Sequence, residues 1–438
     1  MRISPSIIFA TTLILATSML FATAMAQAGE PMHIPTKMPS ATPESVGMST
    51  TGLNRINELI QEHVDAEHIQ GAVTVVARRG KVVHFSTHGK MDVEKGREME
   101  ADAIFRMASS SKPVLGVAAM MMIEEGLIKM SDPVSKYIPE FADAKVAVLA
   151  EPANAKAESA KPKSKKRYAK KEIPKHRLVP VETPVTIHHL LTHTSGLQSG
   201  GLGDAVNEVS RTPDDTLATY TTKLAKVPLD FEPGTRWSYS PRTGHDVVAR
   251  IIEIVSGTSY DVFLRERIFK PLHMNSTYFN LPTGLESKRV VLNNDWAKAK
   301  GWGKRTKYFS ASGGLSSAAE DYLHFEQMLL NGGELFGHRL LAPSSIKMMG
   351  SNQVGDLFGG TGKKGQEGLG FGYSVAVTLD PEIAGNGRGK GAFGWGGAFG
   401  TMSWTDPENE LVAVIMLQQP HGGTHRDFGQ AVWKAIID

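Results

Sequence analysis

The stretch FRMASSSKP, residues 105–113, leads directly into the most apolar segment of the chain. The run from Pro113 to Ile128 is almost wholly apolar, which predicts a helix buried on most sides. Ser109 and Lys112 stand three residues apart at its start, so both project from the same face. The N–H groups and the dipole of the first turn point at whatever Ser109 attacks. Burial favours the neutral form of a lysine, and only a neutral amine accepts a proton from a serine hydroxyl. The segment therefore predicts a serine nucleophile with a lysine partner.

A second Ser-x-x-Lys match joins Ser344 to Lys347. Average composition alone gives roughly two such matches in a chain of this length, so the motif by itself is weak. Ser344 follows Pro343 at the start of what the pattern indicates is a surface helix, where a serine usually caps backbone N–H groups. We therefore interpret Ser344 as structural and Ser109 as the nucleophile.

The patterns on either side of this segment predict an α+β protein. Helical spacing of apolar residues indicates a helix over Ser49–Ile69, and two β-rich runs around Arg78-Arg79-Gly80 indicate a hairpin. The middle of the chain is helical from about Ile187 to Glu334, and Ser317–Glu320 has the pattern of a capping box. Strand patterns return at Gly372–Thr378, Gly400–Trp404 and Leu411–Leu417, before a final helix from Asp427.

Strands near both chain ends thus bracket helices in the middle. We expect an α/β sandwich with a mainly antiparallel sheet flanked by helices and an inserted all-α domain. The sheet-containing domain would comprise residues 27–130 and 336–438, and the helical domain residues 131–335. The active site would lie where the two domains meet.

The N-terminus has the pattern of an export signal. Arg2 precedes an apolar run from Ile7 to about Ala24, and Ala24-Met25-Ala26 is a small-x-small cleavage pattern, which predicts a signal peptide over residues 1–26 cleaved after Ala26. No later stretch approaches the roughly 18 apolar residues of a membrane-spanning helix. We expect a periplasmic or secreted protein with no transmembrane segment in its mature form. The chain has no cysteine, which excludes disulfides, thiolate nucleophiles and cysteine metal sites.

Residues 151–178 form a basic, low-complexity segment. It carries 10 Lys and Arg against 3 Glu, a net charge of +7, whereas the formal charge of the whole chain is +3. The segment has neither a helical nor a strand period, so we interpret it as a solvated loop inserted in the helical domain. The alternative is weak contact with anionic components of the cell envelope. We expect no nucleic-acid partner.

Three motifs together resemble the serine hydrolases related to class C β-lactamases and penicillin-binding D-Ala-D-Ala peptidases. Phe-Arg-x-Ala-Ser-x-x-Lys-Pro matches residues 105–113, and Asp132-Pro133-Val134 with Tyr137-Ile138-Pro139 matches the segment after the helix. LLTHTSGL, residues 190–197, is highly characteristic of these proteins. The resemblance covers nearly the whole chain after residue 26. It implies a β-lactamase/transpeptidase-like fold and a covalent acyl-enzyme on Ser109.

The second element of these hydrolases is Tyr-x-Asn, and Trp237–Pro241, WSYSP, occupies its place. The tyrosine carries over as Tyr239, but the asparagine does not. A phenol near Lys112 can relay protons between Ser109, the lysine and the leaving group. Whether Lys112 or Tyr239 is the formal base stays open.

The third element is Lys-Thr-Gly, and Trp395-Gly396-Gly397 stands at its position. The glycines let a substrate approach the backbone closely. The resemblance implies that the N–H groups of Ala398 and Ser109 form an oxyanion hole, whose donors stabilise charge that develops in the transition state. Trp395 supplies an apolar face where the family has a cation, and Pro241 removes an amide that would bind an acylamide. These departures resemble the family VIII carboxylesterases and favour neutral esters of small to medium size.

Other functions remain as alternatives. A β-lactamase or D-Ala-D-Ala-type peptidase could use the same scaffold on an amide, and a weakly catalytic binding protein of the cell envelope is a further alternative. The chain lacks Gly-x-Ser-x-Gly, the nucleophile elbow of α/β-hydrolases. His188, His189 and His193 lack the glutamate of a His-Glu-x-x-His zinc site, so we expect no metal and no cofactor.

Overall fold

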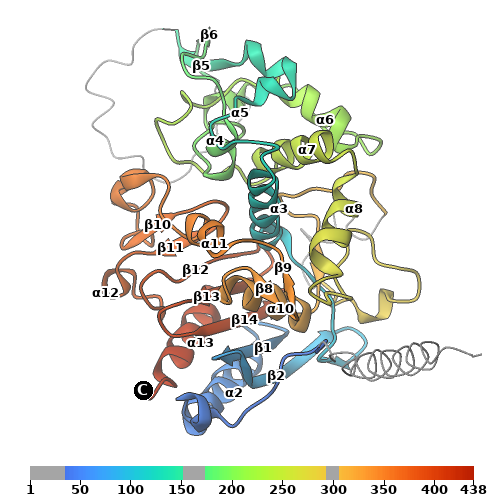
Figure 1. Cartoon of the computed structure of the whole chain (residues 1–438), viewed down its shortest axis with the longest axis vertical. Coiled ribbons are helices and arrows are strands. Elements are labelled where there is room, and N and C mark those ends of the chain that lie inside the picture. The colour runs from blue at the N-terminus through green and yellow to red at the C-terminus, as the bar shows by residue number, and fades with distance from the viewer. Residues whose placement is uncertain (1–34, 151–172, 293–304) are drawn as a thin grey trace, which may run out of the picture. The chain divides into compact units, whose positions relative to one another are not determined.

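The computed structural model describes residues 35–150, 173–292 and 305–438 (Figure 1). The expected signal peptide and most of the basic segment therefore lie outside the described residues. Within those three ranges, no helix is both long enough and apolar enough to cross a membrane. Contacts between residues group Lys37–Asp438 into one unit.

An eight-stranded antiparallel sheet is built from both ends of this unit. Its strand order is β10-β11-β12-β13-β14-β1-β2-β3. The strands are β1 (Gly71–Arg78), β2 (Lys81–Asp92), β3 (Arg97–Glu98), β10 (Leu369–Phe371), β11 (Ala376–Thr378), β12 (Phe393–Gly396), β13 (Met402–Asp406) and β14 (Leu411–Leu417). β1 pairs with β14 from Ala72↔Leu417 to Arg78↔Leu411, so N-terminal and C-terminal strands meet inside the sheet. This confirms the expected antiparallel sheet closed by both ends of the chain.

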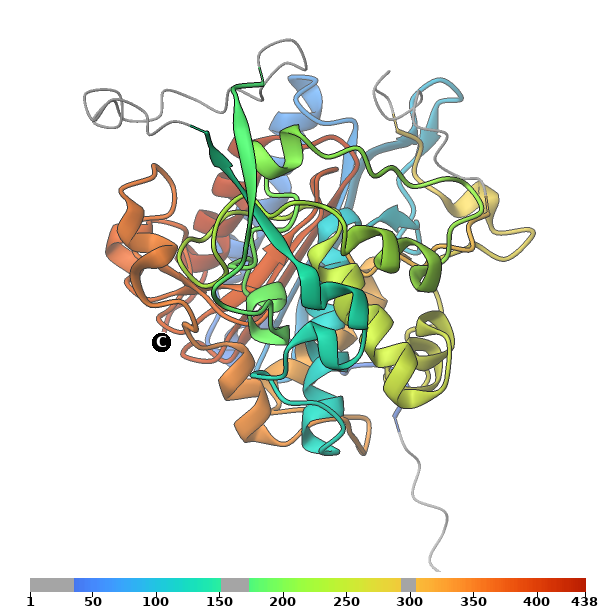
Figure 2. The ribbon, with the colours of Figure 1, turned by 90° about the horizontal axis from the view of Figure 1, so that it is seen from above.

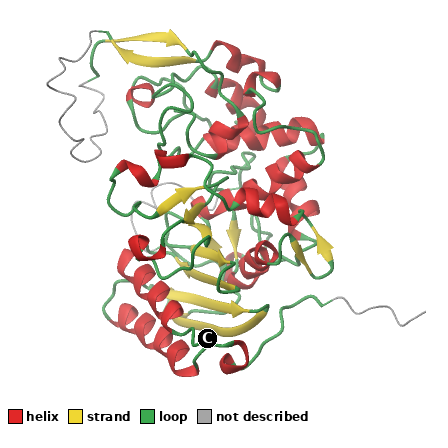
Figure 3. Ribbon diagram, turned by 60° about the vertical axis from the view of Figure 1, so that its left-hand side comes forward, coloured by secondary structure: helices red, strands yellow, loops and turns green. Residues whose placement is uncertain are grey.

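Alternate residues of the central strands belong to two different hydrophobic clusters. Val73 and Val75 of β1 pack in the larger cluster, whereas Ala72 and Val76 pack in the other. Successive side chains of a strand point to opposite faces, so both faces of the sheet are covered. Helices α2 (Thr50–Asp65) and α13 (Gly422–Lys434) cover one face, and α10 (Ala319–Leu330) packs on β1, β13 and β14 from the other, as the red helices around the yellow strands show in Figure 3.

Helix α3 (Lys112–Glu124) extends the core on the side of α10. Its residues from Lys112 to Met122 are buried, as the apolar sequence predicts. It packs against α7 (Gly244–Ser256) and α11 (Pro343–Met349). The other α-helices of the described ranges are α4 (Ile187–Leu191), α5 (Leu202–Ala205), α6 (Leu217–Leu224), α8 (Tyr260–Leu264) and α12 (Pro381–Ala384). Helix α3 thereby connects the sheet to the helical part of the chain.

In the part of the chain that the structure describes, three short strand pairs lie outside the large sheet. They are β4 (Phe105–Arg106) with β7 (Ser316–Ser317), β5 (Lys145–Leu149) with β6 (His176–Pro180), and β8 (Glu334–Leu335) with β9 (His338–Arg339). The hairpin of β5 and β6, green in Figure 2, flanks the basic segment. Residues 176–178, expected in a loop, therefore belong to β6.

Local expectations differ from the structure at four places. The expected strand Gly372–Thr378 is a turn followed by β11, because Ser374 adopts a left-handed φ of 70° and the N–H of Gly372 donates to Val375. The expected capping box is wrong, since Ser317 binds Thr277 and the N-cap of α10 is Ala318, with no side-chain cap. Likewise α11 begins after Ala342 without a side-chain cap from Ser344. The final helix begins earlier than expected, at Gly422.

The division into a sheet domain and a helical domain stays a proposal. Helix α10 packs on the sheet, although the sequence pattern places residues 131–335 in the helical domain. Its sequence lies between the helical middle and the C-terminal strands, so a boundary drawn from the pattern alone placed it with the helices. We propose that the boundary falls before α10.

Candidate active site

Ser109 lies in a short 3-10 turn, η3 (Ala108–Ser111), that continues into α3. The residue before it, Ala108, has a left-handed φ of 45°, a conformation that costs a non-glycine residue about 1 kcal/mol or more. This turn follows directly from β4, which pairs with β7. The short strand pair and the turn thus place Ser109, half-buried, at the N-terminal end of the buried helix.

The structure brings the three expected catalytic side chains together. The phenol of Tyr239 donates to Ser109 Oγ over 2.7 Å, and Lys112 Nζ lies 3.2 Å from the same oxygen. Lys112 is completely buried, and its Nζ lies 5.1 Å from the centre of the Tyr239 ring. Ser109 Oγ therefore contacts one amine and one phenol.

Two backbone carbonyls complete the surroundings of Lys112. Its Nζ donates to the carbonyl of Ser312 over 2.7 Å and to that of Pro241 over 3.2 Å. The N–H of Ser312 in turn donates to Asp246 of α7 over 2.8 Å, and the same carboxyl group accepts from Tyr308 over 2.6 Å. Burial raises the pKa of Asp246, against these hydrogen bonds, which lower it. The buried Asp246 thus fixes the loop whose carbonyl binds the lysine.

Aromatic rings surround Tyr239. Its ring lies 4.7 Å from His193, 5.6 Å from Trp395 and 6.4 Å from Trp237, measured between centres. Burial raises the pKa of Tyr239, but the positive charge of Lys112 and the hydrogen bond with Ser109 lower it, and the net pKa is below the usual value. Burial, and then the charge of Lys112, hold the pKa of His193 well below its usual value. His193 is therefore a neutral ring that packs against the tyrosine.

The expected substrate strand and oxyanion-hole residues are Trp395 to Ala398. Trp395 and Gly396 end strand β12, and Gly397 and Ala398 follow it. Thr401 ties this segment to that of Ser109, because its Oγ1 donates to the carbonyl of Met107 over 3.1 Å and lies 2.9 Å from Ser110 Oγ. A Cβ on Gly397 would lie 2.2 Å from the Met107 carbonyl oxygen, so only glycine fits there. Ala398 is exposed, and among the described residues its N–H has no acceptor. This donor is available to a bound molecule.

Ser109 and Ala398 both line a cavity of 770 Å³. Pro241, Ser312 and Gly313 form part of the same wall. The volume is in the range of pockets that hold small organic ligands. A nucleophile, an N–H donor and space for a substrate therefore meet at one place.

Comparison with known proteins identifies the family. The family model for Beta-lactamase matches residues 56–435. The chain belongs to the β-lactamase family. An uncharacterised protein of Mycobacterium tuberculosis (strain CDC 1551 / Oshkosh) is 32% identical over 381 residues, which cover 82% of this chain and 88% of that protein. Esterase EstB of Burkholderia gladioli is 26% identical over 405 residues, or 84% of this chain and 91% of that protein.

A solved structure shares the fold of this chain. EstCE1, described as a hydrolase with promiscuous acyltransferase activity, superimposes with a TM-score of 0.69 at 24% identity over 87% of this chain and 99% of its own. This likeness shows the shared fold. The expected family and the β-lactamase/transpeptidase-like fold are confirmed, and this family of serine hydrolases includes esterases among the relatives of the chain.

His188 and His189, which the sequence offers as metal ligands, form hydrogen bonds within this β-lactamase-family chain. His189 Nδ1 accepts from the N–H of Thr186 in a capping box, and His188 Nδ1 lies 3.2 Å from the hydroxyl of Tyr373. A different group, His63, His68 and His421, has ligand atoms within 4.8 Å of one another in the part of the chain that the structure describes. His421 Nδ1 accepts from the N–H of Thr424, which places the proton of a neutral ring on Nε2 and leaves no free nitrogen. We assign no role to this group.

Sequence reasoning did not find the carbonyls of Ser312 and Pro241 or the supporting Asp246. A backbone carbonyl carries no signal in residue type. Asp246 could have been noticed as an acidic residue at a buried helix start, but its partners come from residues 308–312, which no motif connects with it.

Proposed function

We propose that the protein is a carboxylesterase, or an acyltransferase, that forms a covalent acyl-enzyme on Ser109 and acts on small to medium esters. The observation that carries the proposal is the position of Ser109 Oγ, 2.7 Å from the Tyr239 hydroxyl and 3.2 Å from Lys112 Nζ at the wall of a 770 Å³ cavity. A serine hydroxyl is a weak nucleophile until a neighbouring base accepts its proton.

Two proton arrangements fit these distances. In the first, Lys112 is a neutral amine whose two N–H groups donate to Ser312 and Pro241, and its lone pair accepts the proton of Ser109. In the second, Lys112 is an ammonium group with three acceptors, and the phenolate of Tyr239 is the base. The lowered pKa of Tyr239 supports the second arrangement, and the two carbonyls fit both.

The remaining steps follow the chemistry of acyl transfer. Ser109 Oγ bonds to the ester carbonyl carbon, and the N–H groups of Ala398 and Ser109 stabilise the negative oxygen of the tetrahedral intermediate. The alcohol leaves with the proton that Ser109 lost, delivered through Tyr239 or Lys112. Water then releases the acid, or a second alcohol takes the acyl group.

Two residues favour esters over β-lactams. Trp395 lies beside Tyr239 and supplies an apolar surface where the resemblance implies a cation. The carbonyl of Pro241 accepts from Lys112 and its ring nitrogen has no N–H to offer a substrate. The name of esterase EstB, a relative over most of both chains, agrees with this choice.

The test measures short-chain p-nitrophenyl esters and a chromogenic cephalosporin side by side. Ser109→Ala should abolish ester turnover, and Ser344→Ala, the serine of the other Ser-x-x-Lys match, serves as the matched control. Cephalosporin cleavage as efficient as ester cleavage would instead indicate a β-lactamase. Absence of any Ser109-dependent turnover would indicate a peptidase or a binding protein.

Export and envelope contact are separate proposals that rest on sequence alone. We propose that residues 1–26 direct export and that the basic segment 151–178 either is solvated or contacts anionic envelope components weakly. N-terminal sequencing of the protein purified from its native cells should begin at Gln27. A mature chain that still begins at Met1 would overturn the export proposal.

A further inference from the structure

The cavity at Ser109 has a strongly basic lining. Five arginines contribute to its wall, namely Arg106, Arg211, Arg242, Arg289 and Arg305. Glu286 is the only acidic residue among its described lining residues. For the described lining, the formal charge is therefore strongly positive, although the chain as a whole is nearly neutral.

Four of these arginines lie in two pairs, Arg106 with Arg289 and Arg211 with Arg242. Burial, and then the charge of Arg289, lower the pKa of Arg106 to about 10. Arg211 lies over the ring of Tyr308, 4.6 Å from its centre, and the charges of Arg211 and Arg242 both act on neighbouring Tyr220. Like charges that lie close together in one cavity repel, so each pair favours an anion between its members.

Among the described residues, carboxyl groups compensate the charge of the cavity arginines only in part. Backbone N–H groups of Glu286 and Gly284, and then the charge of Arg289, lower the pKa of Glu286, so this carboxylate lies near one arginine. Glu286 uses a carboxylate oxygen to accept the N–H of Gly284 over 2.7 Å. Asp246, behind the cavity wall, accepts hydrogen bonds from Tyr308, Ser310 and the N–H of Ser312. Among the described residues, no ion pair within 4.0 Å involves Arg211, Arg242, Arg289 or Arg305, although many exposed arginines elsewhere have one. Their guanidinium groups keep donors for a ligand.

These arginines share the cavity with the nucleophile. Arg242 follows Pro241, whose carbonyl binds Lys112, and Arg106 lies three residues before Ser109. A molecule in this cavity can therefore contact Ser109 and a guanidinium group at the same time. Arginine presents planar N–H donors that match the two oxygens of a carboxylate.

We propose that the ester cleaved at Ser109 also carries an anionic group, of which a carboxylate is the simplest, and that the arginines of the cavity bind this group. The inference rests on the proposed function and narrows its substrate class. The anionic group is bound and not transformed, since the bond that breaks is the ester C–O bond. This proposal replaces the expectation of a neutral ester. Trp395 stands where the family has a cation, and the arginines place positive charge elsewhere in the cavity.

Matched substrates isolate the effect of the charge. Mono-p-nitrophenyl adipate and p-nitrophenyl hexanoate have the same chain length and leaving group and differ by a terminal carboxylate in place of a methyl group. A second pair, 4-acetoxybenzoate and its methyl ester, carries the charge on the alcohol side. For each pair, the ratio of kcat/KM for the anionic to the neutral ester is measured and corrected for spontaneous hydrolysis.

The variant for the test is Arg211→Gln combined with Arg242→Gln. Both side chains are exposed, so their replacement leaves the core intact. Arg236→Gln is the matched control, because Arg236 is also exposed and also lies over an aromatic ring, 5.5 Å from the centre of Phe231, but does not line the cavity. Turnover of the neutral esters by Arg236→Gln should agree with that of the unmodified protein within about twofold, and each variant's ratio is referred to its own neutral-ester turnover.

In the unmodified protein, we expect kcat/KM for the anionic ester to exceed that for the neutral ester by about 10-fold or more in at least one pair, because charge-assisted hydrogen bonds to the arginines stabilise the bound anionic ester. The ratio should fall toward 1 in the double variant through a higher KM, stay unchanged in Arg236→Gln, and decrease with added salt. A ratio near 1 for both pairs, or a high ratio that the double variant retains, overturns the inference while leaving the esterase proposal intact. Absence of Ser109-dependent turnover of every ester would overturn the proposed function itself.

Discussion

The carbonyl oxygen of Ser312 lies 2.7 Å from Lys112 Nζ, closer than the hydroxyl oxygen of Ser109 at 3.2 Å. The lysine is thus oriented chiefly by the backbone of a loop remote in sequence. That loop depends on Asp246, which accepts hydrogen bonds from Tyr308, Ser310 and the N–H of Ser312. Asp246 is therefore a positioning residue for the proposed base.

Asp246→Asn should lower kcat for p-nitrophenyl butyrate by about 10- to 100-fold, because a small displacement of Ser312 moves Lys112 out of line with Ser109. KM should change little, since Asp246 lies behind the cavity wall. Asp215→Asn is the control: Asp215 is also buried and accepts from Thr212, Thr219 and Lys223, none of which is a hydrogen-bond partner of Lys112. Equal losses of kcat in both variants would show that only stability is involved.

Tyr239→Phe should lower kcat by about 10²- to 10⁴-fold, the usual contribution of a proton-transfer group. An ionised Tyr239 must exist before it can accept a proton, so kcat/KM should rise with pH through the tyrosine's pKa. Burial raises the pKa of Tyr239, but the charge of Lys112 and the hydrogen bond with Ser109 lower it further. The increase in kcat/KM should therefore occur below pH 10.0, the usual pKa of a tyrosine. A pH profile of kcat/KM checks this.

The control for Tyr239 is Tyr373→Phe, which removes a buried hydroxyl bound to His188. It should keep the profile of the unmodified protein. If Tyr239→Phe also keeps both kcat and the rise with pH, Lys112 alone is the base.

Gly397→Ala should reduce kcat/KM by about 10²-fold or more, the cost of losing one oxyanion donor. The added methyl group would lie 2.2 Å from the Met107 carbonyl and 2.4 Å from Thr401 Oγ1, and must displace Ala398 or the segment of Ser109. Gly422→Ala, where no atom lies within 4 Å of the added carbon, should be neutral. Ester kinetics of the two variants compare them directly, and normal turnover by Gly397→Ala would remove the oxyanion role from this segment.

We expect Glu326 to make the stability of the protein depend on pH. Burial raises its pKa to about 7, against hydrogen bonds from Ser403 and Thr405, which lower it. Between the unfolded value of 4.5 and about 7, the unfolded chain releases a proton that the folded protein retains, so stability falls as pH rises through this window. The loss is complete above about pH 7 and amounts to roughly 3 kcal/mol.

Glu326→Gln should therefore lose less stability between pH 5 and pH 8 than the unmodified protein, as measured by chemical denaturation. Glu320→Gln, on the same helix but partly exposed beside Lys37, should not alter the pH dependence. A parallel decline in the unmodified protein and in Glu326→Gln would place the pH dependence elsewhere.

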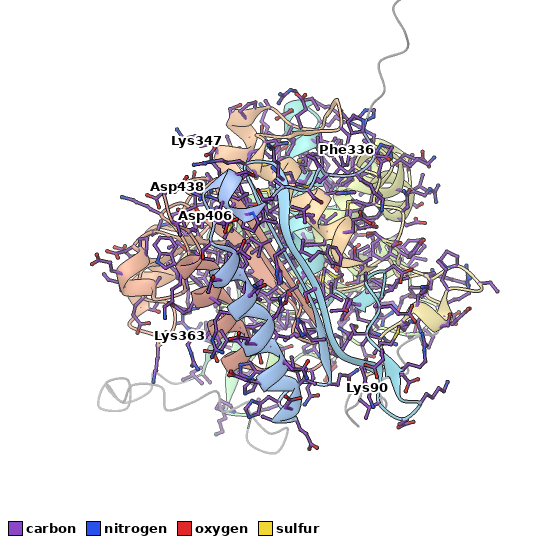
Figure 4. The ribbon with its side chains drawn as sticks, turned by 90° about the horizontal axis from the view of Figure 1, so that it is seen from below. Lys90, Phe336, Lys347, Lys363, Asp406 and Asp438 are labelled. Atoms are coloured by element: carbon purple, nitrogen blue, oxygen red, sulfur yellow. The ribbon has the colours of Figure 1, made fainter. Side chains whose placement is uncertain are left out.

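The fold and the convergence of Ser109, Lys112 and Tyr239 could be predicted from the resemblance to the β-lactamase-related serine hydrolases, because each of these residues stands in a motif of that family. The sequence also separated Ser109 from Ser344: Ser344 and Lys347 are exposed on α11, and Figure 4 shows the Lys347 side chain at the edge of the molecule. Capping was predicted less well. Ser317 has a capping pattern, but its hydroxyl binds Thr277, since a tertiary partner outweighs a local preference.

The basic cavity could not be predicted. Its arginines come from positions 106, 211, 242, 289 and 305, each unremarkable alone, and only the fold brings them to one wall. The sequence instead drew attention to Trp395, which suggested a neutral substrate. Charge in a site depends on the distribution of residues in space, which a linear pattern does not contain.

The pairing of β1 with β14 also determines the order in which the molecule can fold. Residues 72–78 find their partners at residues 411–417, so one side of β1 stays unpaired until nearly the whole chain has been synthesised. Contacts so distant in sequence slow folding, and an unpaired apolar strand promotes aggregation while it waits. Until residues 411–417 have been synthesised, β1 can pair only with β2 in its native register, and its other edge is open to wrong partners.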